Sequence, residues 1–284
     1  MPTVAGIDVG SRSTKAVLLD DSGTVLGTAT VKTRPDFDGV AREALTKAAE
    51  AANVMEADVN YVATTGFGRY AVSFRDLQIT EITCAAKGAA HLFPATRCVL
   101  DIGAQSSRAI RIFAGGKVRE FKSNDKCAAG AGGFVERAAR YLEISLDDVG
   151  PLSLKATDPQ PISSVCAVLA ESEIINHISN GLSVENIVRG IHDSLASRAM
   201  ALLARVGLEP ELTLTGGVAY QAGMIAALSK AAGMPVNVPP HPETASALGA
   251  ALLGLARLAA RDHSVSTATR SAVSAPGPEY ATAG

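Results

Sequence analysis

The sequence lacks an excess of charge of either sign, with 26 lysines and arginines against 28 aspartates and glutamates and a formal net charge of -2. No overall field therefore favours nucleic acid or an anionic membrane, and an anionic ligand has to be held locally. Long apolar runs are also lacking, because the stretch from Ala247 to Ala260 is interrupted by Arg257 and is too short to cross a bilayer of about 30 Å. Since the first residues lack the charged and then apolar run of a signal peptide, we expect a cytoplasmic protein with no nucleic-acid or membrane partner.

Cysteines are few: the 284 residues contain four, which is not the framework of a disulfide-stabilised secreted protein. Cys98 lies in an apolar segment and Cys84 lies among small residues, so we expect both in the core. Cys127 opens a glycine-rich loop, and Cys166 lies near a predicted helix N-terminus, where the helix dipole favours thiolate over thiol. From the residues alone, each of these two is either a metal ligand or a small buried hydrophobic residue. The five histidines lack metal-ligand spacing and are interpreted as structural or solvated.

What the sequence does contain is an internal repeat. Residues 8–17 read Asp-Val-Gly-Ser-Arg-Ser-Thr-Lys-Ala-Val, and residues 101–110 read Asp-Ile-Gly-Ala-Gln-Ser-Ser-Arg-Ala-Ile. Each copy has an apolar run, Asp-x-Gly, a short polar turn and alternating apolar residues, which predicts a strand, a glycine-opened hairpin and a second strand. We therefore expect an α/β protein of two related half-domains, residues 1–95 and 96–262. A flexible tail rich in Ser, Thr, Ala and Pro is expected over residues 263–284.

Periodicity and capping residues predict the remaining elements. Ser163 and Ser164 are expected to cap a helix that carries Cys166 in its first turn, and Ser183 is expected to cap a longer helix. A polar link is expected over residues 151–161, which begin and end with proline. Further predicted elements are helices over residues 38–53, 134–142 and 244–261, and strands over residues 59–64 and 212–215.

Three glycine turns at strand ends indicate a phosphate ligand, because backbone N–H groups approach phosphate oxygens closely where no Cβ intervenes. The two Asp-x-Gly hairpins are expected to face each other across a nucleotide cleft, with Asp8 and Asp101 holding the hydration shell of Mg²⁺. One such hairpin alone is better explained as a structural turn, but the duplication together with residues 215–217 favours the nucleotide. The other candidate nucleotide-binding residues are Gly10, Ser11, Ser13, Thr14 and Lys15 in the first hairpin, Gly103 and Ala104 in the second, and Gly132, Glu136, Gly216 and Gly217 elsewhere.

Four motifs carry a resemblance to a known family: residues 6–10 (Gly-Ile-Asp-Val-Gly), 63–66 (Ala-Thr-Thr-Gly), 125–130 (Asp-Lys-Cys-Ala-Ala-Gly) and 163–166 (Ser-Ser-Val-Cys). From roughly Thr3 to Leu258 the chain resembles the BadF/BadG/BcrA/BcrD ATPase family, which includes ATPase subunits of benzoyl-CoA reductase and activators of 2-hydroxyacyl-CoA dehydratases. The resemblance implies the actin-like fold of the acetate and sugar kinase/Hsp70/actin superfold, with binding and hydrolysis of ATP.

The same resemblance implies a 4Fe-4S cluster at a subunit interface, with Cys127 and Cys166 as its ligands in this chain. Because such a cluster takes four thiolates, a homologous ATPase subunit would have to supply the others.

The second hairpin departs from the activators, in which it resembles Asp-Ile-Gly-Gly-Gln-Asp, because this chain has Ala104 and Ser106. Gln105 is retained and is a candidate for orienting the attacking water. The variant resembles the D-type ATPase subunit of benzoyl-CoA reductase, which implies electron transfer to catalytic iron-sulfur subunits, with ferredoxin as the donor. The alternatives are a homodimeric dehydratase activator, a small-molecule kinase of the same superfold, and a nucleotide-binding scaffold with little hydrolysis.

Overall fold

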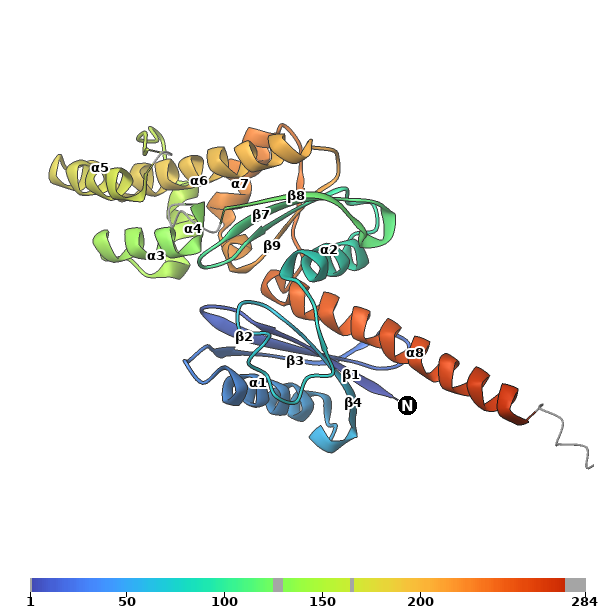
Figure 1. Ribbon diagram of the computed structural model, residues 1–284. Coiled ribbons are helices and arrows are strands. Elements are labelled where there is room, and N and C mark those ends of the chain that lie inside the picture. The colour runs from blue at the N-terminus through green and yellow to red at the C-terminus, as the bar shows by residue number, and fades with distance from the viewer. Residues whose placement is uncertain (1, 125–129, 164–165, 274–284) are drawn as a thin grey trace, which may run out of the picture.

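The computed structural model describes residues 2–124, 130–163 and 166–273, which contain two five-stranded mixed sheets (Figure 1). In the first sheet the strand order is β3-β2-β1-β4-β5, with β1 antiparallel to β2 and parallel to β4. Its strands are β1 (Thr3–Val9), β2 (Ser13–Leu19), β3 (Val25–Lys32), β4 (Val59–Thr65) and β5 (Leu77–Gln78).

The second sheet repeats this arrangement in the order β8-β7-β6-β9-β10, with β6 antiparallel to β7 and parallel to β9. Its strands are β6 (Cys98–Ile102), β7 (Ser107–Ile112), β8 (Val118–Asn124), β9 (Leu212–Thr215) and β10 (Val236–Asn237). The strand, hairpin and strand predicted from the repeat are therefore confirmed in both copies.

Helices cover both faces of each sheet. Apolar residues of α1 pack on one face of the first sheet and those of α8 on the other, while α2 and α6 cover the two faces of the second sheet. In the part of the chain that is described, no helix is long and apolar enough to span a membrane. The helices are α1 (Phe37–Ala52), α2 (Glu81–Leu92), α3 (Gly132–Tyr141), α4 (Leu146–Leu154), α5 (Ala167–Ser179), α6 (Val184–Val206), α7 (Ala222–Ala232) and α8 (Ala245–Val273).

The two sheets are joined by an exchange of helices. After β5 the chain enters α2, which packs on the second sheet, and from the second half it returns through α8, which packs on the first sheet. The helices lie against each other between the sheets (Figure 1). Their contact depends on glycine, because a Cβ added to Gly88 would lie 1.9 Å from the carbonyl oxygen of Ala245, and one added to Gly249 would lie 1.9 Å from that of Cys84. The boundary predicted at residue 95 assigns α2 to the first half, although this helix packs on the second sheet.

Three predicted element boundaries are wrong. Pro151 lies inside α4, although residues 151–161 were expected to form a polar link. The N-cap of this helix is Ser145, which accepts a hydrogen bond from the N–H of Asp148. Cys166 is the N-cap residue of α5 with an extended backbone, so it precedes the first turn that it was expected to occupy. The last helix extends to Val273 and not only to Arg261, because no glycine or proline lies between Gly254 and Val273 to stop it earlier.

The interpretation of the histidines as structural or solvated agrees with the surroundings of His192 on α6. Its side chain is fully buried, and its Nδ1 lies 2.8 Å from the Oγ of Ser153. Burial lowers the pKa of His192 to about 4, so the imidazole is neutral at physiological pH. The role of this residue is core packing.

Substitution of Gly249 by alanine should destabilise the protein by about 1–3 kcal/mol, because the added methyl group collides with the backbone of α2. Gly254→Ala is the matched control on the same helix: its methyl group meets side chains, Ala63 and Val4, at 3.0 and 3.1 Å. Both changes gain about 1 kcal/mol of helix propensity, so the difference between them isolates the contact. Urea unfolding followed by circular dichroism measures it, and equal stability of the two variants would contradict the tight crossing.

Candidate functional site

A cleft of about 880 Å³ lies between the two sheets, where the Asp-x-Gly hairpins face each other. Its walls come from both copies of the repeat, from the start of α3 and from the loop after β9. Thirteen of the fourteen candidates predicted for catalysis and nucleotide binding line it: Asp8, Gly10, Ser11, Ser13, Lys15, Asp101, Gly103, Ala104, Gln105, Gly132, Glu136, Gly216 and Gly217.

The remaining candidate, Thr14, does not line the cleft. Its side chain is fully buried, and its Oγ1 lies 2.9 Å from the Oγ1 of Thr33, which donates a hydrogen bond to the carbonyl of Gly10. Since successive side chains of β2 point to opposite faces, Ser13 and Lys15 face the cleft and Thr14 cannot. Thr14 therefore stabilises the hairpin from behind.

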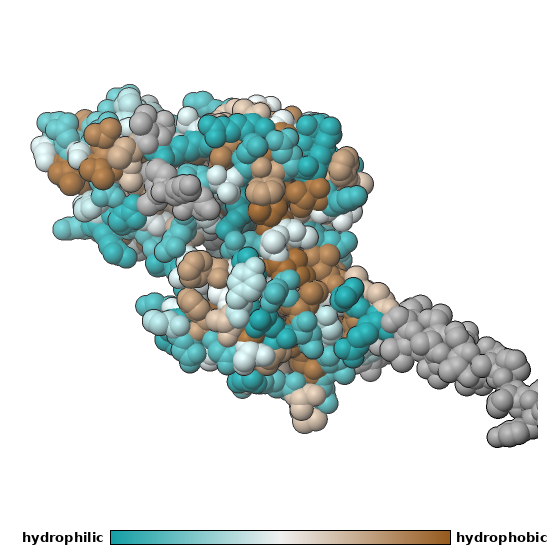
Figure 2. Space-filling model, in the orientation of Figure 1, coloured by the Kyte–Doolittle hydropathy of each residue, from teal (hydrophilic) through white to brown (hydrophobic). Residues whose placement is uncertain are grey.

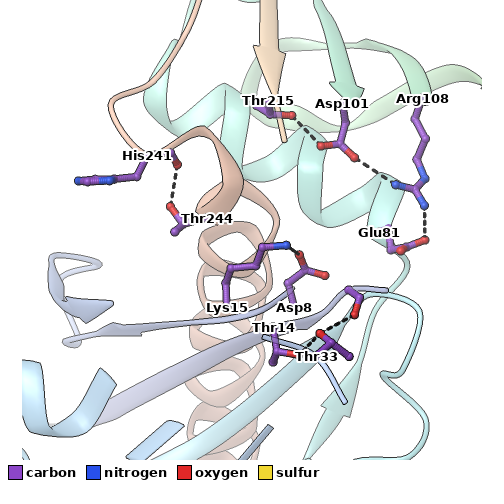
Figure 3. Close-up of polar contacts among 11 residues, drawn as sticks. Asp8, Thr14, Lys15, Thr33, Glu81, Asp101, Arg108, Thr215, His241 and Thr244 are labelled. Carbon is purple, nitrogen blue, oxygen red and sulfur yellow. Dashed lines mark hydrogen bonds and ion pairs between the residues drawn. The ribbon is translucent and has the colours of Figure 1, made fainter. Parts of the chain in front are cut away.

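Each aspartate is paired with a cation of its own hairpin (Figure 3). Lys15 Nζ lies 3.2 Å from Asp8 Oδ2, and Arg108 Nη1 lies 3.1 Å from Asp101 Oδ2. Asp101 also accepts a hydrogen bond from Thr215 Oγ1 at 3.0 Å. Lys15 and Arg108 occupy the same position in the two copies of the repeat, so the alignment of the copies carried a signal for Arg108 that the candidate set missed.

Two glycines bring the neighbouring backbone close behind the aspartates. Gly66 follows β4 with φ +90°, and Gly216 follows β9 with φ +87°, a conformation that other residues rarely adopt. A Cβ on Gly66 would lie 2.4 Å from Asp8 Oδ1, and one on Gly216 would lie 3.1 Å from Asp101 Oδ1. The two halves thus fix their carboxylates in the same way, at the ends of a pair of parallel strands.

Glu81, the first residue of α2, is a cleft residue that sequence reasoning missed. Its Oε2 accepts a hydrogen bond from Arg108 Nη2 at 2.7 Å, so one guanidinium joins Glu81 to Asp101. Burial raises the pKa of Glu81, Arg108 opposes the rise, and the charges of Asp8 and Asp101 add to it. Nothing in its local sequence distinguishes this glutamate from an ordinary helix-start acid, because its partners are distant in the chain.

The donor set of the cleft fits a hydrated magnesium ion. Asp8 and Asp101 present carboxylate oxygens, which Mg²⁺ prefers, and the ion usually keeps several waters beside substrate phosphates. Among the described residues no three His, Cys, Asp or Glu side chains are grouped so that they could hold a metal directly. Asp8 and Asp101 are the residues that would contact the water shell of an Mg²⁺ ion bound in this cleft.

Ion pairs connect the cleft to the helix that begins after Cys166. Arg12, in the first hairpin, contacts Glu136 on α3 across the cleft at 2.5 Å. The next residue of α3, Arg137, donates a hydrogen bond from Nε to Glu171 on α5 at 2.7 Å. Glu136 and Glu171 therefore each pair with an arginine of another part of the chain.

The prediction that Cys84 and Cys98 lie in the core is confirmed. Cys84 and Cys98 are fully buried, and burial raises their pKa values to about 12 and about 11, so both remain thiols at neutral pH. Cys166 is partly exposed at the N-terminus of α5. The other predicted ligand, Cys127, lies outside the described residues.

The helix that follows Cys166 presents an apolar surface. Four of its side chains, here called the α5 patch, are exposed although they are hydrophobic, and Figure 2 shows apolar residues gathered at this end of the molecule. The α5 patch consists of Val168, Leu169, Ile175 and Ile178.

Comparison with known proteins agrees with this geometry. Residues 5–254 match the BadF/BadG/BcrA/BcrD ATPase family. The chain is 47% identical over 247 residues to the activator of lactoyl-CoA dehydratase from Anaerotignum propionicum, covering 87% of this chain and 95% of that protein. It is 41% identical over 268 residues to the D-type subunit of benzoyl-CoA reductase from Thauera aromatica, covering 90% and 94%.

A solved structure gives the same fold. The activator of the 2-hydroxyisocaproyl-CoA dehydratase from Clostridium difficile, solved with bound ADPNP, superposes with a TM-score of 0.85 at 31% identity, covering 98% of this chain and 100% of that one. The prediction of an actin-like α/β fold with two duplicated halves around a cleft is thereby confirmed.

The thiols should differ in reactivity. In a Cys127→Ser variant of the folded, metal-free protein, we expect Cys166 to react with Ellman's reagent, while Cys84 and Cys98 react only after unfolding in guanidinium chloride, because they are buried and protonated. A Cys127→Ser/Cys166→Ser variant is the control and should show no reactive thiol in the folded state. Rapid reaction of Cys84 or Cys98 before unfolding would contradict the core assignment.

Proposed function

The chain belongs to the BadF/BadG/BcrA/BcrD ATPase family, and we propose that it is the ATP-hydrolysing component that delivers low-potential electrons to a partner enzyme acting on an acyl-CoA. The observation that carries the proposal is the pair of Asp-x-Gly hairpins that line one cleft from opposite sides. Glycine backbone on both sides and the N-terminus of α3 suit a triphosphate, while Asp8 and Asp101 suit its magnesium ion.

Phosphate binding in the cleft would change the present pairing of the hairpins. Without a ligand, Lys15 pairs with Asp8 and Arg108 pairs with Asp101. When Mg²⁺ and a triphosphate bind, each cation would contact a phosphate and each aspartate would contact the water shell of the ion. Since the two hairpins belong to different sheets, a ligand that contacts both draws the halves together. The α2–α8 contact is where the halves would move against each other.

Movement of the hairpins reaches the cysteine region through the two ion pairs. Arg12 of the first hairpin holds Glu136, so closure or opening of the cleft acts on α3, whose first turn follows the Cys127 loop in the sequence. Arg137 then connects α3 to Glu171 on α5, the helix that begins directly after Cys166. This relay is the route by which we propose that ATP binding and hydrolysis change the surroundings of the two cysteines.

A shared 4Fe-4S cluster fits the part of this region that is described. Cys166 is a partly exposed thiol at a helix N-terminus, where the dipole stabilises a thiolate. Cys127 and Cys166 would hold the cluster together with two thiolates of a second subunit, and the cluster when bound accepts and donates a single electron. The α5 patch provides apolar surface beside Cys166 on which such a subunit could pack.

Two partner assignments compete for the finer function. The sequence of residues 101–106 favours the ATPase subunit of benzoyl-CoA reductase, in which an unequal ATPase subunit shares the cluster, ferredoxin donates the electron and separate catalytic iron-sulfur subunits receive it. The 47% identity to the lactoyl-CoA dehydratase activator favours a homodimeric activator of a dehydratase. The benzoyl-CoA reductase subunit is our first proposal, and the subunit composition of the purified complex separates the two.

The test is anaerobic co-expression with neighbouring gene products, followed by iron and sulfide analysis and paramagnetic resonance of the reduced complex with and without ATP. We expect a reduced 4Fe-4S signal that changes with ATP in the wild type, and its loss in Cys166→Ser with ATP binding retained. Cys98→Ala is the matched control, because this buried thiol is not a proposed ligand, and it should keep its iron. Iron-free wild-type protein that binds ATP would favour a kinase or a scaffold instead.

A further inference from the structure

Among the described residues, four cations line the cleft: Arg12, Lys15, Lys32 and Arg108. Lys15 and Arg108 are mostly buried beside the two aspartates. Lys32 belongs to β3, the edge strand, and lies outside both hairpins. Arg12 differs from the other three because it lies in the turn of a hairpin, between the end of β1 and the start of β2.

The turn that carries Arg12 is held by Thr33, the residue that follows β3. The carbonyl of Arg12 accepts a hydrogen bond from the N–H of Thr33 at 2.9 Å, and the hydroxyl of Thr33 donates to the carbonyl of Gly10 at 2.8 Å. The side chain of Arg12, by contrast, is 56% exposed. The backbone of the turn is therefore fixed, whereas the guanidinium can change partners.

The present partner of Arg12 lies on the other side of the cleft. Arg12 Nη1 contacts Glu136 Oε2 on α3 at 2.5 Å. Helix α3 begins against the second hairpin, because the N–H of Gly132 donates to the carbonyl of Gly103 at 2.9 Å. The Arg12–Glu136 pair therefore spans the gap between the hairpins, which is where the proposed triphosphate lies.

The γ-phosphate of ATP competes with Glu136 for this guanidinium. Phosphate carries more negative charge than a carboxylate, and its oxygens accept the two parallel N–H donors of an arginine. Phosphoryl transfer also spreads negative charge over the oxygens of the γ-phosphate, where a cation lowers the barrier. Because ADP lacks this group, Arg12 has only Glu136 as its partner after hydrolysis.

We propose that Arg12 is a catalytic residue of the ATPase: with ATP bound, its guanidinium leaves Glu136 and binds the γ-phosphate. The inference rests on the proposed nucleotide site. The oxygen of a water forms a bond to the γ-phosphorus as the bond from that phosphorus to the bridging oxygen breaks, and the electron pair of the broken bond stays on ADP. Inorganic phosphate and a proton leave to solvent. Arg12 takes no proton and stabilises the negative charge of the transferring group.

The exchange makes the first ion pair of the proposed relay depend on the nucleotide. Without a γ-phosphate, Arg12 holds Glu136 and so connects α3 to the first hairpin. With ATP bound, Glu136 faces the γ-phosphate without its cation, and the repulsion of like charges favours movement of α3. Arg137, the next residue, carries that movement to Glu171 on α5.

The test measures single-turnover ATP hydrolysis by the wild-type complex, Arg12→Ala and Arg12→Lys, together with binding of ADP and Mg·ADPNP by calorimetry. We expect Arg12→Ala to lower the rate of hydrolysis at least about 100-fold. Its affinity for ADPNP should fall about three- to tenfold and that for ADP by less than about twofold, because only ADPNP has the phosphate that Arg12 binds. Arg12→Lys should keep part of the rate, since it retains the charge and loses the paired donors.

Glu136→Gln separates a catalytic arginine from a merely structural ion pair. The change removes the group that competes for Arg12 and the repulsion of the γ-phosphate. We therefore expect ADPNP to bind about three- to tenfold more tightly and hydrolysis to stay within about threefold of the wild type. Equal losses of hydrolysis in Arg12→Ala and Glu136→Gln would show that the pair acts only as a link between the hairpins, and would overturn the catalytic role.

Arg34→Gln is the matched control. The side chain of Arg34 is also 56% exposed and also pairs with a glutamate, Glu43, but Arg34 does not line the cleft, so this variant should hydrolyse ATP at the wild-type rate. Thermal unfolding checks that each variant is folded. Hydrolysis by Arg12→Ala within about threefold of the wild type would contradict the role of Arg12 and leave the proposed function intact. A wild-type complex that binds ATP without hydrolysing it would contradict both.

Discussion

Two carboxylates of like charge, Asp8 and Asp101, face one cleft, and the arrangement of the site depends on how each is compensated. Each lies at the end of a strand and is in close contact with a glycine turn of the neighbouring parallel strand. Each is also paired with a cation seven residues later in its own hairpin. This pairing balances both charges and keeps the carboxylates pointed at the cleft without a ligand. In the proposed function a magnesium nucleotide would contact both hairpins at once, which would link the occupancy of the cleft to the relative position of the two halves.

The helices α2 and α8 connect the two hairpins to the relative position of the two sheets. Because α2 packs on the second sheet and α8 returns from the second half to pack on the first sheet, the halves cannot separate without breaking the α2–α8 contact. Gly88 and Gly249 permit backbone to approach backbone there, and packed surfaces of this kind move by small sliding steps. The same helix α2 begins with Glu81, so a residue that lines the cleft is carried by the helix that makes the contact between the halves.

The sequence was sufficient to predict both hairpins, most of the helices and thirteen of the fourteen cleft candidates, because an internal repeat compares the chain with itself. Thr14 was misplaced because Ser13, Thr14 and Lys15 are all polar, so alternation in hydrophobicity did not reveal which face of β2 they occupy. Glu81 and Arg108 were missed as a pair because their interaction is set by the packing of α2 on the second sheet. Such long-range contacts leave no periodic signal in a single sequence. The length of α8 was underestimated because residues 262–273, although largely polar, contain no glycine or proline that would stop a helix.

The most direct test of the account is a crystal structure of the protein with ADPNP and Mg²⁺. We predict a triphosphate between the two hairpins, in contact with backbone N–H groups of residues 10–13 and 103–104, with the ion's water shell hydrogen-bonded to Asp8 and Asp101. A nucleotide bound elsewhere, or a magnesium ion remote from both aspartates, would contradict the assignment of the cleft.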